Sequence, residues 1–277
     1  MEDDVLWHEQ HDKSDTDSDE EGDEMYDDMM THEQIQQMFN EDSDDDEFLD
    51  QVKQTDKAHT GVAPIAVDDQ GQNSIIIVSG ANLLLSPNDV NAVEGVIKSA
   101  KILICQLEID PCTTLAALKL AKTHGVMTIL NPAPAQSDLD PQMYKYCDIL
   151  CPNETEAEIL TGMPVNCIDD AKHILPLLLD KGCGCVVITM GSQGSVFATQ
   201  EYKSACHITT DKVDPVDTTG AGDSFIGALG YFLAKHKDLD FGECIRRANA
   251  IAAKSVQSPG TQNSYPWKKD LPGALFQ

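Results

Sequence analysis

Short apolar runs and segments of helical period alternate along residues 61–277. The runs at 102–106, 126–130, 148–151 and 186–190 are strand-length, and the segments between them place apolar residues three and four apart. Repeated alternation of this kind predicts a mostly parallel sheet covered by helices on both faces. We therefore expect an α/β fold, with ligands bound beyond the carboxyl ends of the strands.

The same pattern predicts individual elements. Two runs, 62–67 and 74–78, flank the turn cluster at 68–71 and indicate a β-hairpin. A helical period follows Ser86-Pro87. Longer helices are expected at 112–124, 171–181, 220–235 and 242–255.

Charge divides the chain at about residue 56. The formal net charge is −28, and residues 1–56 contain 23 acidic and 2 basic side chains. Self-repulsion and the scarcity of apolar residues predict a disordered acidic tail over 1–56, followed by a folded domain over 57–277. Two interpretations of the tail stay open: a solvated segment, or a recruitment segment for a basic partner. The acidic balance argues against nucleic-acid binding through a basic face.

The nine cysteines and the short apolar runs argue against a disulfide scaffold, a zinc site and a membrane-spanning protein. A disulfide scaffold is not expected in a chain of this length, so we predict reduced and mostly buried thiols. Cys147 and Cys151 lack a second Cys or His pair at zinc-ligand spacing. No run is long enough to span a bilayer. The predicted location is the cytoplasm, with the nucleus as an alternative.

The segment from Asp217 to Asp223, Asp-Thr-Thr-Gly-Ala-Gly-Asp, carries the strongest chemical signal. Gly220 and Gly222 allow a ligand to approach the backbone closely, and the helix that follows directs free N–H groups at the same place. A phosphoryl group in transfer needs such an environment. Asp223 is a poor phosphate ligand, so its predicted task is to accept a proton from an attacking hydroxyl. The alternative is a glycine-rich turn capped by Asp223.

Three further segments are weaker candidates. Asn153 and Glu156 lie one helical turn apart and either organise magnesium through waters or form a capping box. Residues 189–194 form a polar glycine loop suited to a nucleotide, or a simple hairpin turn. Glu108 follows a buried strand and either bonds a sugar hydroxyl or is a solvated loop acid.

Taken together, these motifs make the stretch from about residue 60 to the C-terminus resemble the ribokinase/PfkB family of carbohydrate kinases. Supporting segments are Thr60-Gly61-Val62-Ala63-Pro64-Ile65, Gly80-Ala81-Asn82, Asn131-Pro132-Ala133-Pro134-Ala135, residues 152–158, Gly260-Thr261-Gln262, Ser264 and Pro266-Trp267. The resemblance implies a three-layer α/β/α fold with a small β lid. It also implies ATP-dependent phosphorylation of D-ribose at the 5-hydroxyl, giving ribose 5-phosphate, with Mg²⁺ and K⁺ as cofactors and a homodimer through the lid as an option.

Residue roles follow from the resemblance. It implies that Asp223 is the base and that Gly220, Ala221 and Gly222 form the anion hole. The implied ATP contacts are Asn153, Thr189, Met190, Gly191, Ser192, Gln193, Gly194, Gly222, Asp223 and Asn249. Ribose would contact Glu108 and Asp223, and Glu156 would help to organise magnesium indirectly. The implied monovalent-cation site comprises Asp217, Thr219, Ser255, Ser258, Gly260 and Ser264.

The sequence departs from the family at its N-terminal side. The family's first strand, with an early Asn or Asp for the sugar, and its Gly-Gly-Lys-Gly-x-Asn segment do not precede Thr60. We therefore expect an N-terminally truncated domain with part of the ribose pocket missing and impaired activity. The alternatives are an inactive nucleotide-binding isoform whose acidic tail recruits partners, an unrelated acidic segment joined to the kinase, and another sugar or nucleoside kinase of the family.

Overall fold

The computed structural model describes residues 51–67 and 73–277. The chain divides into two units, Met1–Gln54 and Thr55–Gln277, and every element below belongs to the second. Most of the predicted acidic tail and the predicted turn at 68–71 lie outside the described residues.

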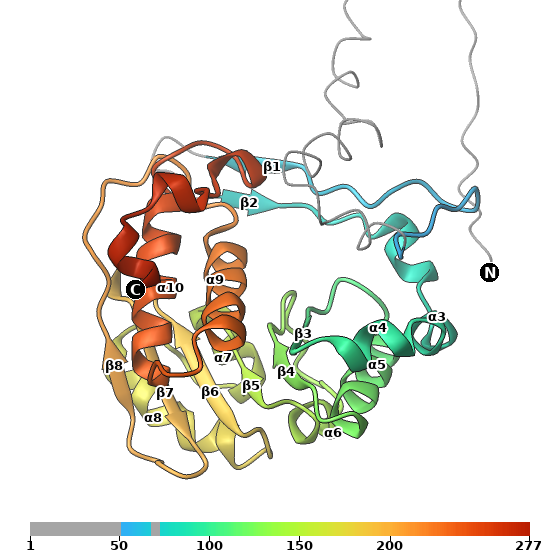
Figure 1. Ribbon diagram of the computed structural model, residues 1–277, viewed down its shortest axis with the longest axis horizontal. Coiled ribbons are helices and arrows are strands. Elements are labelled where there is room, and N and C mark those ends of the chain that lie inside the picture. Colours follow the sequence, from blue (N-terminus) through green and yellow to red (C-terminus); the bar gives the residue numbers. More distant parts are fainter. Residues whose placement is uncertain (1–50, 68–72) are drawn as a thin grey trace, which may run out of the picture. The chain divides into compact units, whose positions relative to one another are not determined.

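A six-stranded sheet forms the centre of the second unit (Figure 1). Its strands neighbour one another in chain order: β3 (Ile102–Cys105), β4 (Met127–Leu130), β5 (Ile149–Leu150), β6 (Cys185–Thr189), β7 (Ser195–Thr199) and β8 (Cys206–Ile208). β3 to β6 pair in parallel, whereas β7 and β8 pair antiparallel. The predicted mostly parallel sheet is confirmed, and β7 and β8 add a meander that the sequence pattern did not predict.

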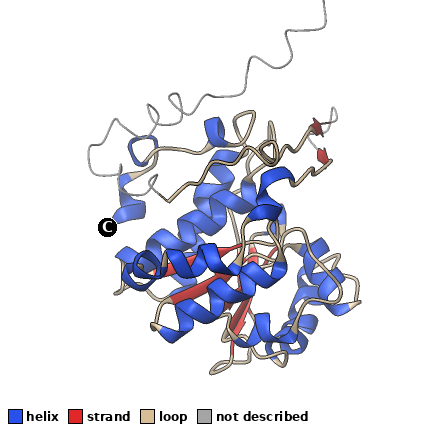
Figure 2. Cartoon of the chain, turned by 90° about the vertical axis from the view of Figure 1, so that its right-hand side faces the viewer, coloured by secondary structure: helices blue, strands red, loops and turns tan. Residues whose placement is uncertain are grey.

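Helices cover both faces of this sheet, as predicted (Figure 2). Along β4 and β5, Leu130 and Leu150 pack into one core cluster, and the preceding Ile129 and Ile149 pack into another on the opposite face. This alternation follows from the two-residue period of a strand. On the first face lie α5 (Pro111–Thr123), α6 (Pro141–Lys145), α7 (Glu154–Thr161) and α8 (Ile168–Leu179), and on the second α9 (Ala221–Lys235) and α10 (Phe241–Ser255).

In the described part of the chain, the short α-helices α3 and α4 precede the sheet. α3 (Pro87–Ala92) begins at Ser86, which forms a capping box with Asp89, and Val93 separates it from α4 (Glu94–Ser99). Val90 and Ile97 pack with α5 in a third core cluster. The helical period predicted after Pro87 is therefore present but broken once.

The predicted hairpin is also present, as β1 (Ile65–Val67) paired antiparallel with β2 (Asn73–Ile75) and one further bridge between Val62 and Val78. Single-turn 3₁₀ helices complete the described chain. They are η1 (Gly80–Leu84), η2 (Gly191–Gln193), η3 (Gln262–Ser264), η4 (Lys268–Asp270) and η5 (Gly273–Phe276).

All nine cysteines are free thiols, as predicted, and five of them are buried. Cys147 and Cys151 pack into core clusters on opposite faces of the sheet, which explains why their spacing does not produce a metal site. Within residues 51–67 and 73–277, no helix is both long and apolar enough to cross a membrane.

Candidate active site

The first turn of α9 is the centre of the candidate site. Gly220 is its N-cap residue and has φ of 75°, a left-handed conformation that glycine adopts without strain. Ala221 and Gly222 follow in the first turn, where N–H groups lack intrahelical acceptors and the helix dipole favours negative charge. The backbone that the sequence predicted as an anion hole therefore lies at a helix N-terminus.

Asp223 is the third residue of this helix. Burial of its carboxyl group raises the pKa, and a hydrogen bond from the Tyr265 hydroxyl, 3.5 Å from Oδ2, opposes that shift. A raised pKa brings a carboxylate closer to the range in which it accepts a proton efficiently. Asp223 also lines an open cavity of about 420 Å³, together with Tyr231, Tyr265 and Lys268.

On the other side of the same turn, Ala221 and Gly222 line a second cavity of about 410 Å³, within the size range of small-molecule sites. Its other walls come from β6, α7, α10 and the loop after β8. The lining residues are Asn153, Glu154, Thr189, Gly191, Ser192, Gly194, Thr210, Asp211, Val213, Pro215, Thr218, Phe225, Asn249, Ala252, Ala253 and Val256. The first turn of α9 thus separates one cavity that contains Asp223 from another that is lined by its glycine backbone.

Of the six residues predicted for the nucleotide in the loop 189–194, four line this cavity and two do not. Thr189, Gly191, Ser192 and Gly194 line it, in the β6–β7 turn that also fits the simple hairpin interpretation. By contrast, the Met190 side chain is 1% exposed and packs in the core, and Gln193 is not part of the cavity wall. His207 Nε2 lies 2.7 Å from the Gln193 carbonyl oxygen.

Asn249 also lines this cavity, although its side chain already has partners. Its Oδ1 accepts a hydrogen bond from Ser195 Oγ at 2.7 Å, and its Nδ2 donates to the Ile208 carbonyl at 3.2 Å. The residue is 6% exposed. Asn249 therefore joins α10 to β7 and β8 and fixes the shape of the cavity wall.

Asn153 and Glu156 form the capping box at the start of α7. Glu156 Oε2 accepts from the Asn153 backbone N–H at 2.8 Å, and Asn153 Oδ1 accepts from the Glu156 N–H at 2.8 Å. Asn131 donates a longer bond, 3.4 Å, to the same carboxylate. Burial raises the pKa of Glu156, whereas the hydrogen bonds from Asn153 and Asn131 oppose that shift. The capping box is therefore present, and its carboxylate is partly buried.

The predicted cation residues gather at the end of α10. Asp217 is 9% exposed, its Oδ1 accepts from the Thr219 N–H, and its Oδ2 accepts from the Gly260 N–H, both at 2.9 Å. A hydrogen bond from the Thr219 side chain is the main cause that holds the pKa of Asp217 low, and these two backbone bonds add to it. Ser258 N–H donates to the Ser255 carbonyl and Ser264 Oγ to the Thr261 carbonyl.

No basic side chain in the described part of the chain forms an ion pair with Asp217. A buried carboxylate without a basic partner, beside backbone carbonyls, fits a monovalent cation chemically. Among the described residues, no cluster of three or more His, Cys, Asp or Glu side chains forms a metal site of the usual kind.

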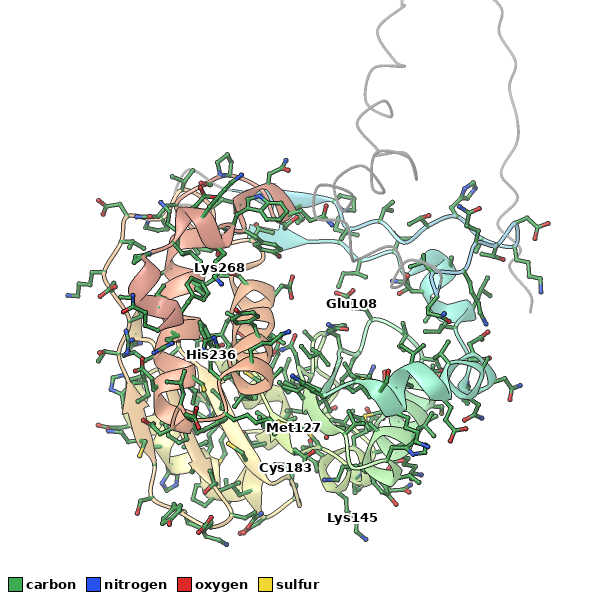
Figure 3. All side chains as sticks on the ribbon, viewed as in Figure 1. Glu108, Met127, Lys145, Cys183, His236 and Lys268 are labelled. Atoms are coloured by element: carbon green, nitrogen blue, oxygen red, sulfur yellow. The ribbon has the colours of Figure 1, made fainter. Side chains whose placement is uncertain are left out.

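Glu108 is exposed on the loop that follows β3 (Figure 3). The neighbouring Leu107 is buried, and its N–H donates to the Ala133 carbonyl at 2.9 Å, which anchors the loop to the segment after β4. Glu108 therefore lies at the carboxyl edge of the parallel strands, where the sequence predicted it.

Sequence reasoning missed Tyr265 and the loop at 210–215. Tyr265 lies between Ser264 and Pro266, which were both recognised, but its partner Asp223 is 42 positions away. No periodicity links positions so distant. The 210–215 loop follows a strand that was not predicted, so its place in the cavity wall could not be inferred either.

A parallel sheet with a helix N-terminus and a carboxylate at its carboxyl edge, between two cavities, defines a phosphotransferase-type site for a hydroxyl acceptor. The family comparison agrees: residues 45–268 match the pfkB family carbohydrate kinase model. The chain belongs to this family of carbohydrate kinases.

Individual relatives give the same result. The chain is 52% identical to mouse ribokinase over 223 residues, which are 80% of this chain and 69% of the mouse protein. It is 40% identical to a deoxyribokinase of Salmonella typhi, over 75% of this chain and 66% of that protein. The chain thus spans about two thirds of the length of these relatives. The structure of Arabidopsis thaliana ribokinase complexed with ribose and ATP is similar with a TM-score of 0.67 and 31% identity, covering 77% of this chain and 68% of that one.

Proposed function

We propose that this chain transfers the γ-phosphoryl group of ATP to the 5-hydroxyl of D-ribose. The observation that carries the proposal is the position of the α9 first turn. Its glycine backbone lines the second cavity described above, of about 410 Å³, which is called the nucleotide-sized cavity below, and Asp223 lines the other. A similarity to mouse ribokinase of 52% identity supports ribose as the acceptor.

In the proposed reaction, Asp223 accepts the proton of the 5-hydroxyl as its oxygen forms a bond to the γ-phosphorus. The bond from that phosphorus to the oxygen bridging the β- and γ-phosphates breaks, and ADP leaves with the bonding pair. The first-turn N–H groups of α9 stabilise the charge on the transferring phosphoryl oxygens. Mg²⁺ would neutralise phosphate charge, with Glu156 organising it through water. K⁺ would occupy the Asp217 site and stabilise the anion-hole loop.

The test is ribose-dependent ADP formation with Mg²⁺ and K⁺, in wild type and in Asp223→Asn. Because general-base catalysis contributes roughly 10²- to 10⁴-fold, we expect a loss of that order in kcat. The variant should still bind a non-hydrolysable ATP analogue in calorimetry. Comparing ribose with 2-deoxyribose assigns the acceptor. If the wild-type protein makes ADP no faster than the Asp223→Asn variant, the transfer proposal is wrong.

One observation favours a second candidate, nucleotide binding without transfer. The nucleotide-sized cavity is enclosed by residues between 153 and 256, whereas the sugar contacts implied by the resemblance include only Glu108 and Asp223. Analogue binding in a chain without ribose-dependent ADP formation would support this candidate, and absence of binding would reject both.

A further inference from the structure

Tyr265 packs directly on the N-cap residue of α9. A Cβ atom built on Gly220 would lie 2.5 Å from the Tyr265 hydroxyl oxygen and 3.1 Å and 3.2 Å from two ring carbons. Real side chains do not approach that closely, so the ring occupies space that exists because residue 220 has no side chain. The phenol is thus held against the start of the anion hole.

The same hydroxyl faces the carboxylate of Asp223. Its oxygen lies 3.5 Å from Asp223 Oδ2, which is long for an O–H···O bond but usual for catalytic groups before substrate binds. The ordinary pKa of a phenol is about 10. The phenol therefore keeps its proton at neutral pH and acts as a donor.

The segment that carries Tyr265 is fixed at several points. The Tyr265 N–H donates to the Gln262 carbonyl at 3.3 Å, and the Ser264 N–H donates to the Thr261 carbonyl at 2.9 Å. At the start of the segment, Gly260 donates to Asp217. Because these bonds hold the backbone that leads to Tyr265 and tie it to Asp217, they position the phenol relative to the segment before α9.

Other charged groups also face Asp223. The Asp223 charge raises the pKa of Glu156, in the capping box of α7, as the smallest of several causes, and Lys268, in η4, lines the same cavity as Asp223. Neither forms a hydrogen bond with Asp223 within the described residues. Tyr265 is therefore the group that contacts the carboxylate directly.

We propose that Tyr265 is a positioning residue, which orients the Asp223 carboxylate and stabilises its charged form by donating a hydrogen bond within the cavity that both residues line. This inference rests on the proposed role of Asp223 as the base. It extends that role by assigning the residue that sets the pH range in which the base works.

The test is a titration of side-chain carboxyl groups by NMR, on the full chain labelled with ¹³C at aspartate. The signal of Asp223 is assigned by its absence from Asp223→Asn. Tyr265→Phe keeps the ring and removes the donor, so the Asp223 pKa should rise by about 0.5–1 unit, as expected for one hydrogen bond. Tyr231→Phe is the matched control, since it removes another hydroxyl from the same cavity and should shift the pKa by less than about 0.2 unit.

A Tyr265→Phe shift no larger than that of Tyr231→Phe would overturn the proposal. If Tyr265→Phe does not fold, the wild type decides: the Cζ signal of Tyr265 must move with the titration of Asp223, and an independent Cζ signal contradicts the contact.

This titration needs no turnover, which separates the inference from the proposed function. If ribose is phosphorylated, the acid limb of kcat/KM should move to higher pH in Tyr265→Phe, because its base loses its charge at a higher pH. The KM for ATP should stay within about twofold, since Tyr265 does not line the nucleotide-sized cavity. Turnover without the pKa shift rejects only the role of Tyr265. The shift without turnover rejects only the transfer proposal.

Discussion

At the scale of single residues, the two glycines just before Asp223, Gly220 and Gly222, are needed for different reasons. Gly220 has φ of 75° and the Tyr265 hydroxyl against its α-carbon. Gly222 lies within α9, and a Cβ on it would meet nothing within 4 Å. The first is needed for local backbone conformation and packing, whereas the second leaves open space for a ligand.

Gly220→Ala should therefore lower the free energy of unfolding by about 1–3 kcal/mol, through left-handed strain and the clash with Tyr265. Gly222→Ala should leave it unchanged or raise it by up to about 1 kcal/mol, since alanine favours a helix. Urea unfolding followed by circular dichroism measures both. Equal effects of the two substitutions would contradict this assignment.

A double-mutant cycle isolates the part that Tyr265 contributes. Because Tyr265→Phe removes the closest atom, Gly220→Ala should cost about 0.5–1 kcal/mol less in that background. Strictly additive costs would mean that backbone strain explains the whole effect.

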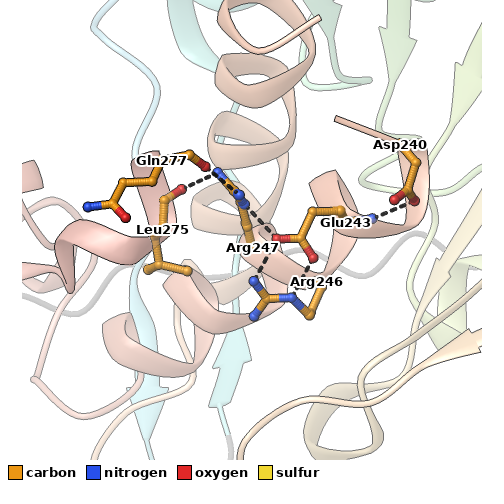
Figure 4. Close-up of polar contacts among 6 residues, drawn as sticks. All are labelled: Asp240, Glu243, Arg246, Arg247, Leu275 and Gln277. Carbon is orange, nitrogen blue, oxygen red and sulfur yellow. Dashed lines mark hydrogen bonds and ion pairs between the residues drawn. The ribbon is translucent and has the colours of Figure 1, made fainter. Parts of the chain in front are cut away.

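At the scale of elements, Arg247 connects the end of the described chain to α10 (Figure 4). Its guanidinium donates to Glu243 Oε1 at 2.7 Å, to the Leu275 carbonyl at 2.6 Å and to the Gln277 carbonyl at 2.9 Å. Arg247 is 5% exposed. Arg246 bonds the same carboxylate from the solvent side, at 2.6 Å and 2.7 Å. Two arginines thus share one acid at different depths.

Arg247→Ala should reduce the free energy of unfolding by about 2–4 kcal/mol, because buried carbonyls and part of Glu243 lose charged donors. Arg246→Ala is the matched control and should cost less than about 1 kcal/mol, as for an exposed ion pair. Thermal unfolding compares the two. Equal costs for Arg246→Ala and Arg247→Ala would contradict the assignment of the larger stabilisation to the buried arginine.

The elements also show what the sequence could and could not predict. Helices such as α5 and α9 were predicted within one or two residues, because apolar period and glycine or proline boundaries are local signals. β7 and β8 were missed, since their antiparallel pairing depends on partners rather than on their own pattern. The break at Val93 was missed for a similar reason, because apolar period continues across it.

For the candidate site too, the sequence predicted some features and missed others. Asp217, Thr219 and Gly260 were predicted together, and the hydrogen bonds of Asp217 join them. Met190 was predicted among the ATP contacts from its place in a glycine loop, and its side chain is buried in the core. A motif gives the path of the backbone, but the direction of each side chain depends on the neighbours that the fold supplies.

At the scale of the whole molecule, charge is distributed unevenly between the two units. Residues 1–54 carry a formal charge of −20 of the total −28. ATP is itself an anion, so an acidic segment could weaken its binding over long range. At 0.15 M ionic strength, however, charges more than about 8 Å apart are largely screened.

Deleting residues 1–54 tests this effect by calorimetry with an ATP analogue at 0.15 M salt: if screening removes the repulsion, the dissociation constant changes by less than about twofold. A full-length variant in which the acids of residues 14–28 are replaced by their amides lowers the negative charge without shortening the chain. A larger change in either variant would mean that the acidic segment takes part in nucleotide binding.

The agreement between strand order and chain order affects how the molecule is synthesised. Each strand from β4 to β8 emerges from the ribosome after the neighbour it pairs with, so the sheet can grow by addition at one edge. The helices that cover its second face, α9 and α10, are translated last. Until then Ile129, Ile149 and Val187 have no covering layer. A nascent chain halted before residue 221 therefore exposes an apolar sheet face, and chaperones rather than a nucleotide would bind to it.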